Sequence, residues 1–369
     1  MERRLARNFD LLMLVVIVLI VAIGIALIYS ATTSTEAGDK WTERSFVRQA
    51  VLGLSGLAIL VLASTIDYHL LGNAHWLLYV GAIGVLGAVA TRGYVGFGAQ
   101  SWLSLRRAIQ PAELAKVLVI VFLAKFMADH EEQMRTLSWV LLTGALVLVP
   151  TFLVYRQPDV GSALVLITVW IGMVFSAGAR FEHLGLLGVT GAASAPAVWF
   201  SMKDYMKQRI LVFLYPAQDV SGMSYNSRQA LISIGSGGWL GKGYLHGTQS
   251  QLHFLLVRHT DYIFSVLCEE LGFVGALVLL LLLLLLLWRI LRAARLARDM
   301  FGRLICCGVA SLIFFQTFVN IAVNVGLLPV TGLTLPLVSY GGSSLWATLL
   351  ALGLVEGVVM RHKKLEFGD

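Results

Sequence analysis

The stretch "LLMLVVIVLIVAIGIALIYS", Leu11 to Ser30, decides the fold class. It is as long as the run of about 20 apolar residues that a helix needs to cross a bilayer core of about 30 Å. The preceding "MERRLARNFD" would suit a secretory signal, but the apolar part is longer than a signal's hydrophobic region and no A-x-A site follows. We therefore expect a retained first membrane span.

The composition extends this conclusion to the whole chain. Hydrophobic residues make up 58% of the 369 residues and charged residues 13%, and the mean hydropathy is +0.80. A soluble domain carries about 25% charged residues. The sequence therefore predicts an all-α polytopic membrane protein, and nothing in it suggests a nucleic-acid partner.

Apolar segments recur along the chain and predict about ten transmembrane helices in one integral membrane domain, residues 1–369. They lie near 9–31, 46–66, 74–91, 111–127, 137–155, 160–177, 183–200, 262–288, 303–324 and 341–360. An even number of spans places both termini on one side. The long polar segment 201–261 is expected to form an extracytoplasmic loop between the seventh and eighth helices.

The distribution of Lys and Arg gives an orientation and one conflict with it. Three basic segments, "MERRLAR", "RILRAARLARDMFGR" and "RHKK", fall on the side of the termini, which the positive-inside rule makes cytoplasmic. About as many cations fall on the outer side. They include Arg106, Arg107, Lys116, Arg156, Arg209, Arg228, Lys242 and Arg258. These are either solvated loop residues or ligands for an anion, and the second reading gains weight for Lys116 and Arg156, beside or inside spans.

The fourth apolar segment begins "IQPAELAK", Ile109 to Lys116. Pro111 suits a first helical turn, Glu113 is favoured there by the helix dipole, and Lys116 three residues later can pair with Glu113. This explains a helix start without any function. It does not explain a lysine one turn inside a span, where ionisable groups usually face a polar cavity.

The sixth segment opens with "RQPDVGSA", Arg156 to Ala163. Asp159 suits a helix N-cap, and Arg156 is a candidate ion-pair partner for it. A direct chemical role for Asp159 is the alternative.

The polar segment contains the glycine-rich stretch "GSGGWLGKGYLHGTQSQLHF", Gly235 to Phe254. No Ser or Thr follows its Gly-Lys pair, so a phosphate-binding loop of the nucleotide-binding type is excluded. The glycines instead predict close packing of backbone against a neighbour. The histidines near Asp261 do not have zinc-ligand spacing, so the metal requirement stays undefined. They are His246, His253 and His259.

A second unusual stretch, "NVGLLPVTGLTLPLVSYGGSSL", precedes the last span. Pro329 and Pro336 exclude a straight helix. Irregular backbone at membrane depth is tolerated where it is buried in protein or lines a cavity. We expect a broken, partly re-entrant segment over 325–345 that borders a polar cavity open to the outer side.

Asp261 lies in "RHTDYIFSVLCEELGF", Arg258 to Phe273, where polar residues run into an apolar helix. It is either an N-cap or, at a boundary reached by water and polar substrate, a general base. Glu269 and Glu270 lie deeper in the same span, so a hydrogen-bonded or ion-paired structural role is expected for them.

Together these stretches resemble the SEDS family of cell-wall polymerases. The matching motifs are "QPAELAK", "QPDVGSA", "ISIGSGGWLGKGYLHGTQSQLHF", "HTDYIFSVLCEELGFVG" and "GLLPVTGLTLPLVSYGGSSL", spread over about residues 98 to 345. The stretch "SGGWLGKGYLHGTQSQLHF" and the "IDY" of Ile66 to Tyr68 are more similar to the elongation-type RodA branch than to the division-type FtsW branch. The chain departs from the family pattern at Ser101, Ala112, Leu256 and Val257.

The resemblance implies a ten-helix glycosyltransferase that polymerises lipid II into the β-1,4 glycan strands of peptidoglycan during elongation and shape maintenance. It implies a class B penicillin-binding protein of the PBP2 type and the elongation machinery as partners, with the nascent lipid-linked glycan as second ligand. It makes Asp261 the essential acid. The expected substrate-binding residues are Lys116, Glu113, Arg106, Arg156, Asp159, Lys242 and His259. A divalent cation, Mg²⁺ or Mn²⁺, is an optional helper.

Two other functions are the alternatives to a polymerase. A flippase or transporter of the lipid-linked precursor would also need intramembrane charge and broken helices. A scaffold that only recruits a transpeptidase would have no use for a charged cavity.

Overall fold

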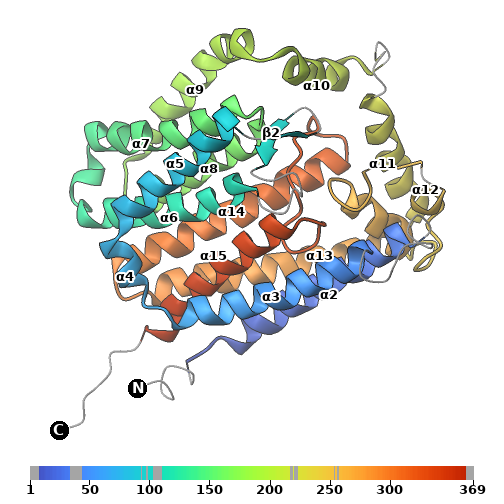
Figure 1. Cartoon of the computed structure of the whole chain (residues 1–369), viewed down its shortest axis with the longest axis horizontal. Helices are drawn as coiled ribbons and strands as arrows, with labels where there is room; N and C mark the ends of the chain where they lie inside the picture. The colour runs from blue at the N-terminus through green and yellow to red at the C-terminus, as the bar shows by residue number, and fades with distance from the viewer. Residues whose placement is uncertain are drawn as a thin grey trace.

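The computed structural model describes residues 8–33, 44–92, 94–96, 99–102, 110–216, 219, 223–252, 254–255 and 257–362. They form a bundle of long helices with both chain ends on one side (Figure 1). We call this side, where α2 begins and α13 and α15 end, the terminal face. The opposite side, where α6, α8 and α15 begin, is the distal face.

Each predicted apolar segment is a helix, with ends within a few residues of those expected except for the eighth, which continues to Leu296. They are α2 (Leu11–Thr32), α3 (Ser45–Thr65), α5 (His75–Arg92), α6 (Pro111–Asp129), α7 (Leu137–Arg156), α8 (Val160–Ser176), α9 (Phe181–Ser201), α13 (Ile263–Leu296), α14 (Met300–Asn324) and α15 (Gly342–Met360). Among the described residues, seven helices are long and apolar enough to cross a membrane, and α5 and α8 contain shorter apolar helical stretches. The predicted all-α polytopic fold is confirmed, and the chain is a multi-pass membrane protein.

The polar segment 201–261 is richer in structure than a plain loop. It contains α10 (Asp204–Leu214), α11 (Met223–Gly237) and the short α12 (Thr248–Gln251). Smaller elements elsewhere are α4 (Tyr68–Asn73), the 3-10 helix η2 (Gln133–Arg135) and the antiparallel strands β1 (Tyr94–Gly96) and β2 (Ala99–Trp102). The strand pair joins α5 to α6 and was not expected from the sequence.

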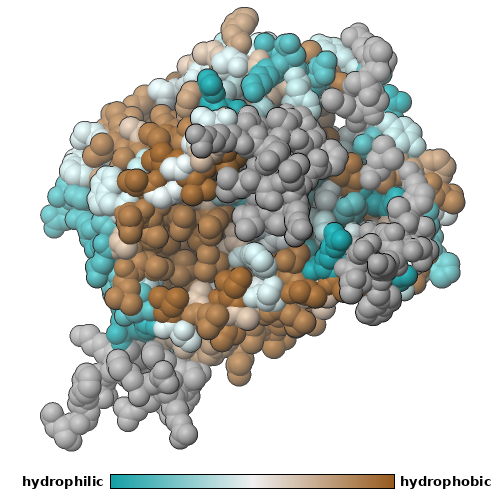
Figure 2. Space-filling view, in the orientation of Figure 1, coloured by the Kyte–Doolittle hydropathy of each residue, from teal (hydrophilic) through white to brown (hydrophobic). Residues whose placement is uncertain are grey.

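Helix α15 lies at the centre and is buried along nearly its whole length. Small residues allow the close helix contacts around it. A Cβ atom on Gly353 would lie 2.6 Å from the carbonyl oxygen of Leu60 in α3, and one on Gly24 would lie 2.7 Å from that of Val338. Apolar side chains instead cover much of the visible outer surface of the bundle (Figure 2), as expected for helices that face lipid.

Helix α13 is broken at Gly272, which has a φ of 64°. We expected an unbroken span over 262–288, and that prediction was wrong. The glycine-rich turn after α11 packs into the break, where the Phe273 amide donates to the Gly238 carbonyl (2.9 Å) and the Val274 amide to the Trp239 carbonyl (3.1 Å). The predicted close approach of the glycines is confirmed, because a Cβ on Gly241 would overlap the backbone of α13.

Candidate active site

The start of α6 places a buried ion pair near the distal face. Pro111 occupies the first turn, and the Nζ atom of Lys116 lies 2.8 Å from Oε1 of Glu113. Lys116 is 1% exposed and Glu113 is buried. The predicted pairing is confirmed. A protein with a buried ion pair is usually no more stable than one with apolar residues of similar volume in its place. The stability of the fold alone therefore does not account for this pair.

Asp159 caps α8 beside this pair. Its Oδ1 atom accepts a hydrogen bond from the Ser162 amide at 2.9 Å, which confirms the N-cap prediction, and its Oδ2 lies 3.5 Å from Nε2 of Gln110. Burial raises the pKa of Asp159, while the Ser162 amide and the charge of Lys116 oppose that rise. The starts of α6 and α8 therefore form one polar cluster inside the bundle.

The segment between α14 and α15 is broken, as predicted. Helix α14 ends at Asn324 and α15 begins at Gly342, and the residues between them form no helix. This segment and the start of α15 pack against the starts of α6 and α8. A Cβ on Gly161 of α8 would lie 2.9 Å from the Thr331 carbonyl oxygen, and the Gln110 amide before α6 donates to Oγ of Ser343 at 2.7 Å.

Asp261 is fixed to the other side of the same segment through its backbone. Its carbonyl oxygen accepts hydrogen bonds from the side-chain amides of Asn320 (3.1 Å) and Asn324 (2.8 Å). The Asn320 amide also donates to the Leu333 carbonyl at 2.8 Å. Asn320 thus joins Asp261 to the same stretch of chain, 330–344, that the starts of α6 and α8 contact.

The N-cap interpretation of Asp261 was wrong. Helix α13 begins at Ile263, and the residue in the cap position is Tyr262. The amide of Ser265 donates instead to Oδ1 of Asn324, at 3.1 Å. The helix start is therefore capped from α14, and the carboxylate of Asp261 is not used for capping.

The carboxyl group of Asp261 has an unusual protonation equilibrium. Burial raises its pKa to about 6, although the charge of Arg209 and a hydrogen bond from Thr260 oppose the rise. Arg209 projects from α10, donates to the Val330 carbonyl at 3.2 Å and stacks 4.5 Å from the ring centre of Tyr205. The sequence places Arg209 among the outer cations but does not predict it in the site. Its proximity to Asp261 depends on α10, which the sequence did not reveal.

His259 lies beside this centre. Its ring contacts that of Tyr340 edge-on at 5.5 Å, and its carbonyl oxygen accepts from the Tyr340 amide at 2.9 Å. The Ser339 hydroxyl donates to the Thr260 carbonyl at 2.6 Å. His259 is thus held in the Asp261 region by the segment before α15, and substrate binding by His259 stays a prediction.

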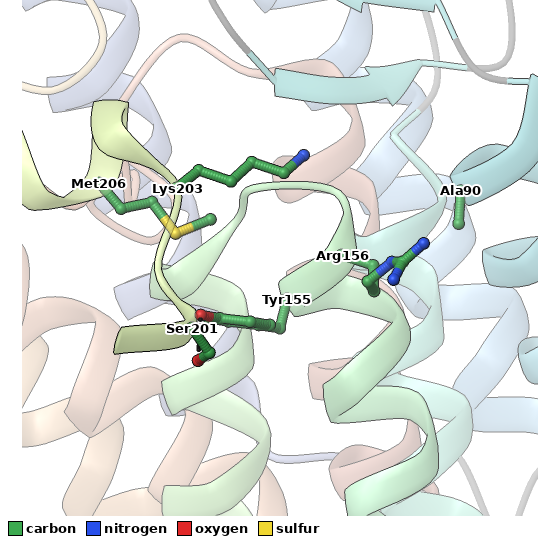
Figure 3. A pocket seen from close by; sticks show the side chains of 6 residues that line it. All are labelled: Ala90, Tyr155, Arg156, Ser201, Lys203 and Met206. Carbon is green, nitrogen blue, oxygen red and sulfur yellow. Dashed lines mark hydrogen bonds between the residues drawn. The ribbon is translucent and has the colours of Figure 1, made fainter. Parts of the chain in front are cut away.

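Arg156 lies apart from Asp159. The ion pairs formed by the described residues do not join the two, and Arg156 is exposed at the end of α7. It lines a cavity of about 390 Å³ together with Tyr155, Ser201 and Lys203. Figure 3 shows Arg156 and Lys203 at this cavity, with Tyr155 lying against Ser201 below them; the two hydroxyl oxygens are 3.0 Å apart. Helix α9, which ends here, has no buried residue and arches away with α10 (Figure 1).

Lys242 has a partner within the protein. Its Nζ lies 2.9 Å from Oε1 of the fully buried Glu269, in the junction between the glycine-rich turn and α13. Glu270, also buried, accepts a hydrogen bond from the Ser30 hydroxyl of α2. The expected pairing or hydrogen bonding of these two acids is confirmed, while their structural role and substrate binding by Lys242 stay predictions.

Other predicted features fall outside the described residues. Arg106, His253 and Leu256 lie there, as does the side chain of Ser101. Ala112 is buried in the first turn of α6, and Val257 is exposed. Within the described part of the chain, His, Cys, Asp and Glu side chains form no group of three or more that could hold a metal ion.

Comparison with known proteins identifies relatives along nearly the whole chain. The family model of FtsW, RodA and SpoVE, described as "Cell cycle protein", matches residues 10–364. The peptidoglycan glycosyltransferase MrdB of Escherichia coli is 40% identical over 312 residues, 84% of each chain. Stage V sporulation protein E of Bacillus subtilis is 34% identical, and the alignment covers 95% of this chain and 96% of that protein.

Solved structures agree. A chain from a peptidoglycan synthase complex that coordinates polymerisation and crosslinking superposes with a TM-score of 0.80 at 33% identity, covering 96% of this chain and 99% of its own. The rod shape determining protein RodA of Thermus thermophilus superposes with a TM-score of 0.69 at 33% identity, covering 95% of this chain and 96% of its own.

Proposed function

Since the chain belongs to the FtsW, RodA and SpoVE family and is a peptidoglycan glycosyltransferase, we propose that it polymerises lipid II with Asp261 as general base, as an elongation-type member. The observation that carries the proposal is the shared segment 330–344. Asn320 joins the Asp261 carbonyl to Leu333 of this segment on one side. On the other side the starts of α6 and α8, which carry Lys116, Glu113 and Asp159, reach the segment through Gln110, which donates to Ser343, and through Gly161, which packs against Thr331. A base and a cation are thus held beside one stretch of broken backbone.

The chemistry follows from the charges at these positions. The acceptor's 4-hydroxyl oxygen attacks C1 of the donor sugar, the bond from C1 to the diphosphate oxygen breaks, and configuration inverts from α to β. Asp261 takes the hydroxyl proton. The negative charge leaves on the diphosphate, and Lys116 stabilises it there.

Lys116 has the donors for that task. An ammonium group carries three N–H bonds, and the hydrogen bond that Lys116 makes to a described residue is the one to Glu113. The remaining donors suit phosphate oxygens. Arg156 and Lys203, at the cavity between α7 and the start of α10, supply further cations for the anionic part of a lipid-linked ligand.

A divalent cation is a separate proposal. Mg²⁺ usually binds one or two carboxylates together with substrate phosphates, so Glu113 and Asp159 would need the diphosphate to complete such a site. Loss of polymerisation on chelation, with recovery on adding Mg²⁺ or Mn²⁺, tests this.

The elongation role and the partner rest on sequence likeness. The motif "SGGWLGKGYLHGTQSQLHF" and the "IDY" of Ile66 to Tyr68 support the elongation branch, and a structural relative belongs to a peptidoglycan synthase complex. We propose a PBP2-type transpeptidase as partner. The basic sequence segments at the chain ends and over 289–303 support a cytoplasmic position for both termini, which would put Asp261 at the outer face of the cytoplasmic membrane.

Purified chain and lipid II in detergent test the proposal. A polymerase makes glycan there without any compartment, whereas a flippase needs two sides of a membrane. We expect glycan strands from the wild type, and more with the transpeptidase present. Transport in vesicles without glycan synthesis in detergent would contradict the proposal, as would activation by a division-type transpeptidase alone.

A further inference from the structure

The terminal face carries a second cavity, remote from Asp261. It has a volume of about 390 Å³ and lies where α2 begins and where α13 and α15 end. Its polar wall is formed by Asp10, Arg289, Arg292 and His362, among other residues. None of these has a place in the proposed polymerisation chemistry.

Two cations in the wall differ in how they are satisfied. Arg289 is bound to Asp10, with Nε 2.7 Å from Oδ2. Arg292, one turn further along α13, is exposed and lies 6.0 Å from the ring centre of Trp288. Among the described residues no carboxylate forms an ion pair with Arg292. Its guanidinium fork therefore remains available to an anion, and this geometry suits phosphate.

His362 adds a further polar atom. Its Nδ1 lies 2.6 Å from the Val359 carbonyl oxygen, so Nε2 is the ring nitrogen left for a ligand. The His362 carbonyl accepts from Nε of Arg298 at 3.1 Å. The charged residues in the cavity wall are thus Asp10, Arg289 and Arg292. Two further charged residues lie behind the wall: Arg298, which contacts His362, and the buried Glu356, which accepts a hydrogen bond from the Asp10 amide.

The rest of the wall is apolar and exposed. Leu11 is 68% and Leu12 46% exposed at the start of α2, and Leu296 also lines the cavity. Trp288, 53% exposed, lies one turn before Arg292, and tryptophan is typical of the membrane–water interface. A soluble anion has no use for these leucines, whereas a lipid places its phosphate at the arginine and its chains along them.

We propose that this cavity binds the phosphate headgroup of an anionic phospholipid, which would hold α2, α13 and α15 together. Basic pockets between transmembrane helices are known to bind such headgroups. The shared chemistry is a phosphate, and its two sources, a lipid or a free ion, are separated below.

The test uses the full purified chain, phosphatidylglycerol, phosphatidylcholine and inorganic phosphate. Lipid adducts are counted by native mass spectrometry, and the melting temperature is measured with each additive. We expect phosphatidylglycerol to bind and raise the melting temperature more than phosphatidylcholine, with no effect of inorganic phosphate. Equal binding of both lipids, or stabilisation by inorganic phosphate alone, would overturn the proposal without reference to any variant.

Arg292→Gln and Arg295→Gln form a matched pair. Both arginines are exposed on α13 within one turn, but only Arg292 is among the lining residues. Arg292→Gln should weaken phosphatidylglycerol binding about fivefold, the effect of one cation near an anionic surface, and Arg295→Gln should not. Equal losses in both variants would show unspecific attraction to a basic surface and refute a built site. Polymerisation by Arg292→Gln in detergent should match the wild type, which keeps this test separate from the proposed function.

Discussion

Two lysine–glutamate pairs lie within the described part of this membrane protein, and they are satisfied to very different degrees. The carboxylate of Glu269 accepts from Lys242 (2.9 Å), from the Thr248 hydroxyl (3.1 Å) and from the amides of Gln249 (2.9 Å) and Ser250 (3.3 Å). Lys242 itself also donates to the Thr248 hydroxyl. This pair is saturated by protein groups and fastens a turn to α13.

Lys116 is more deeply buried than Lys242, and among the described residues the Lys116–Glu113 pair has fewer hydrogen-bond partners than the Lys242–Glu269 pair. In the described structure Lys116 donates to Glu113 at 2.8 Å, and its charge also acts on Asp159. A buried charge with unused donors is costly unless a ligand takes them up. Under the proposed function, the contrast means that partner saturation separates a structural ion pair from one that binds substrate, and the variants below test this.

The largest expected effect comes from the base. Asp261→Asn keeps the carbonyl oxygen that binds Asn320 and Asn324, so the fold should be retained. It removes the proton acceptor, and polymerisation of lipid II by the purified variant should fall by about 10²–10⁴-fold.

Asp204→Asn is the control, because Asp204 is exposed in the first turn of α10. It should polymerise like the wild type. Substantial glycan synthesis by Asp261→Asn would move the base elsewhere, to Glu113 or Asp159.

Lys116→Met tests the comparison directly. Because Lys116 is expected to stabilise the leaving diphosphate, the turnover number should fall about 10²–10³-fold. The double variant Lys116→Met with Glu113→Gln removes both charges and guards against misfolding from an unpaired acid.

Melting temperature and partner binding should stay near wild type in the double variant, while activity stays low. Wild-type turnover in either variant would make Lys116–Glu113 a structural pair like Lys242–Glu269, and the comparison would fail.

The pH profile gives a smaller but independent effect. A base must be deprotonated to act, and burial raises the pKa of Asp261 to about 6. The kcat/KM value should therefore be level above that pH and fall about tenfold for each unit below it. An ordinary aspartate would lose activity only near pH 4. A profile that is level down to pH 5 would show that another group is the base.

The sequence predicted the spans well because bilayer thickness sets helix length and no tertiary information is needed. It also predicted the break over 325–345, since Pro329 and Pro336 exclude a helix locally. The caps and pairs at Glu113, Lys116 and Asp159 followed from contacts within one helical turn.

The failures all depended on contacts between distant segments. Gly272 lies in an apolar run that reads as continuous helix, and the break forms because the turn after α11 supplies the hydrogen bonds. Asp261 resembled an N-cap, but Asn324 from α14 fills that need. Arg209 reaches the site only because its side chain extends from α10 to the Val330 carbonyl. No local pattern contains such information.

The smallest effect on activity is expected at the saturated pair. Lys242→Met leaves Glu269 with its hydroxyl and two amide donors, so the carboxylate is not stranded. The loss is one charge-assisted hydrogen bond from a partly exposed lysine, and the free energy of unfolding should fall by about 1–3 kcal/mol. The turn packed against Gly272 should loosen, which hydrogen exchange at the Phe273 and Val274 amides would detect. Turnover with lipid II should change by no more than about threefold, a bound that follows if Lys242 only fastens this turn. A loss as large as that of Lys116→Met, at unchanged melting temperature, would instead place Lys242 among the substrate ligands and would show that saturation by protein partners does not mark a structural pair.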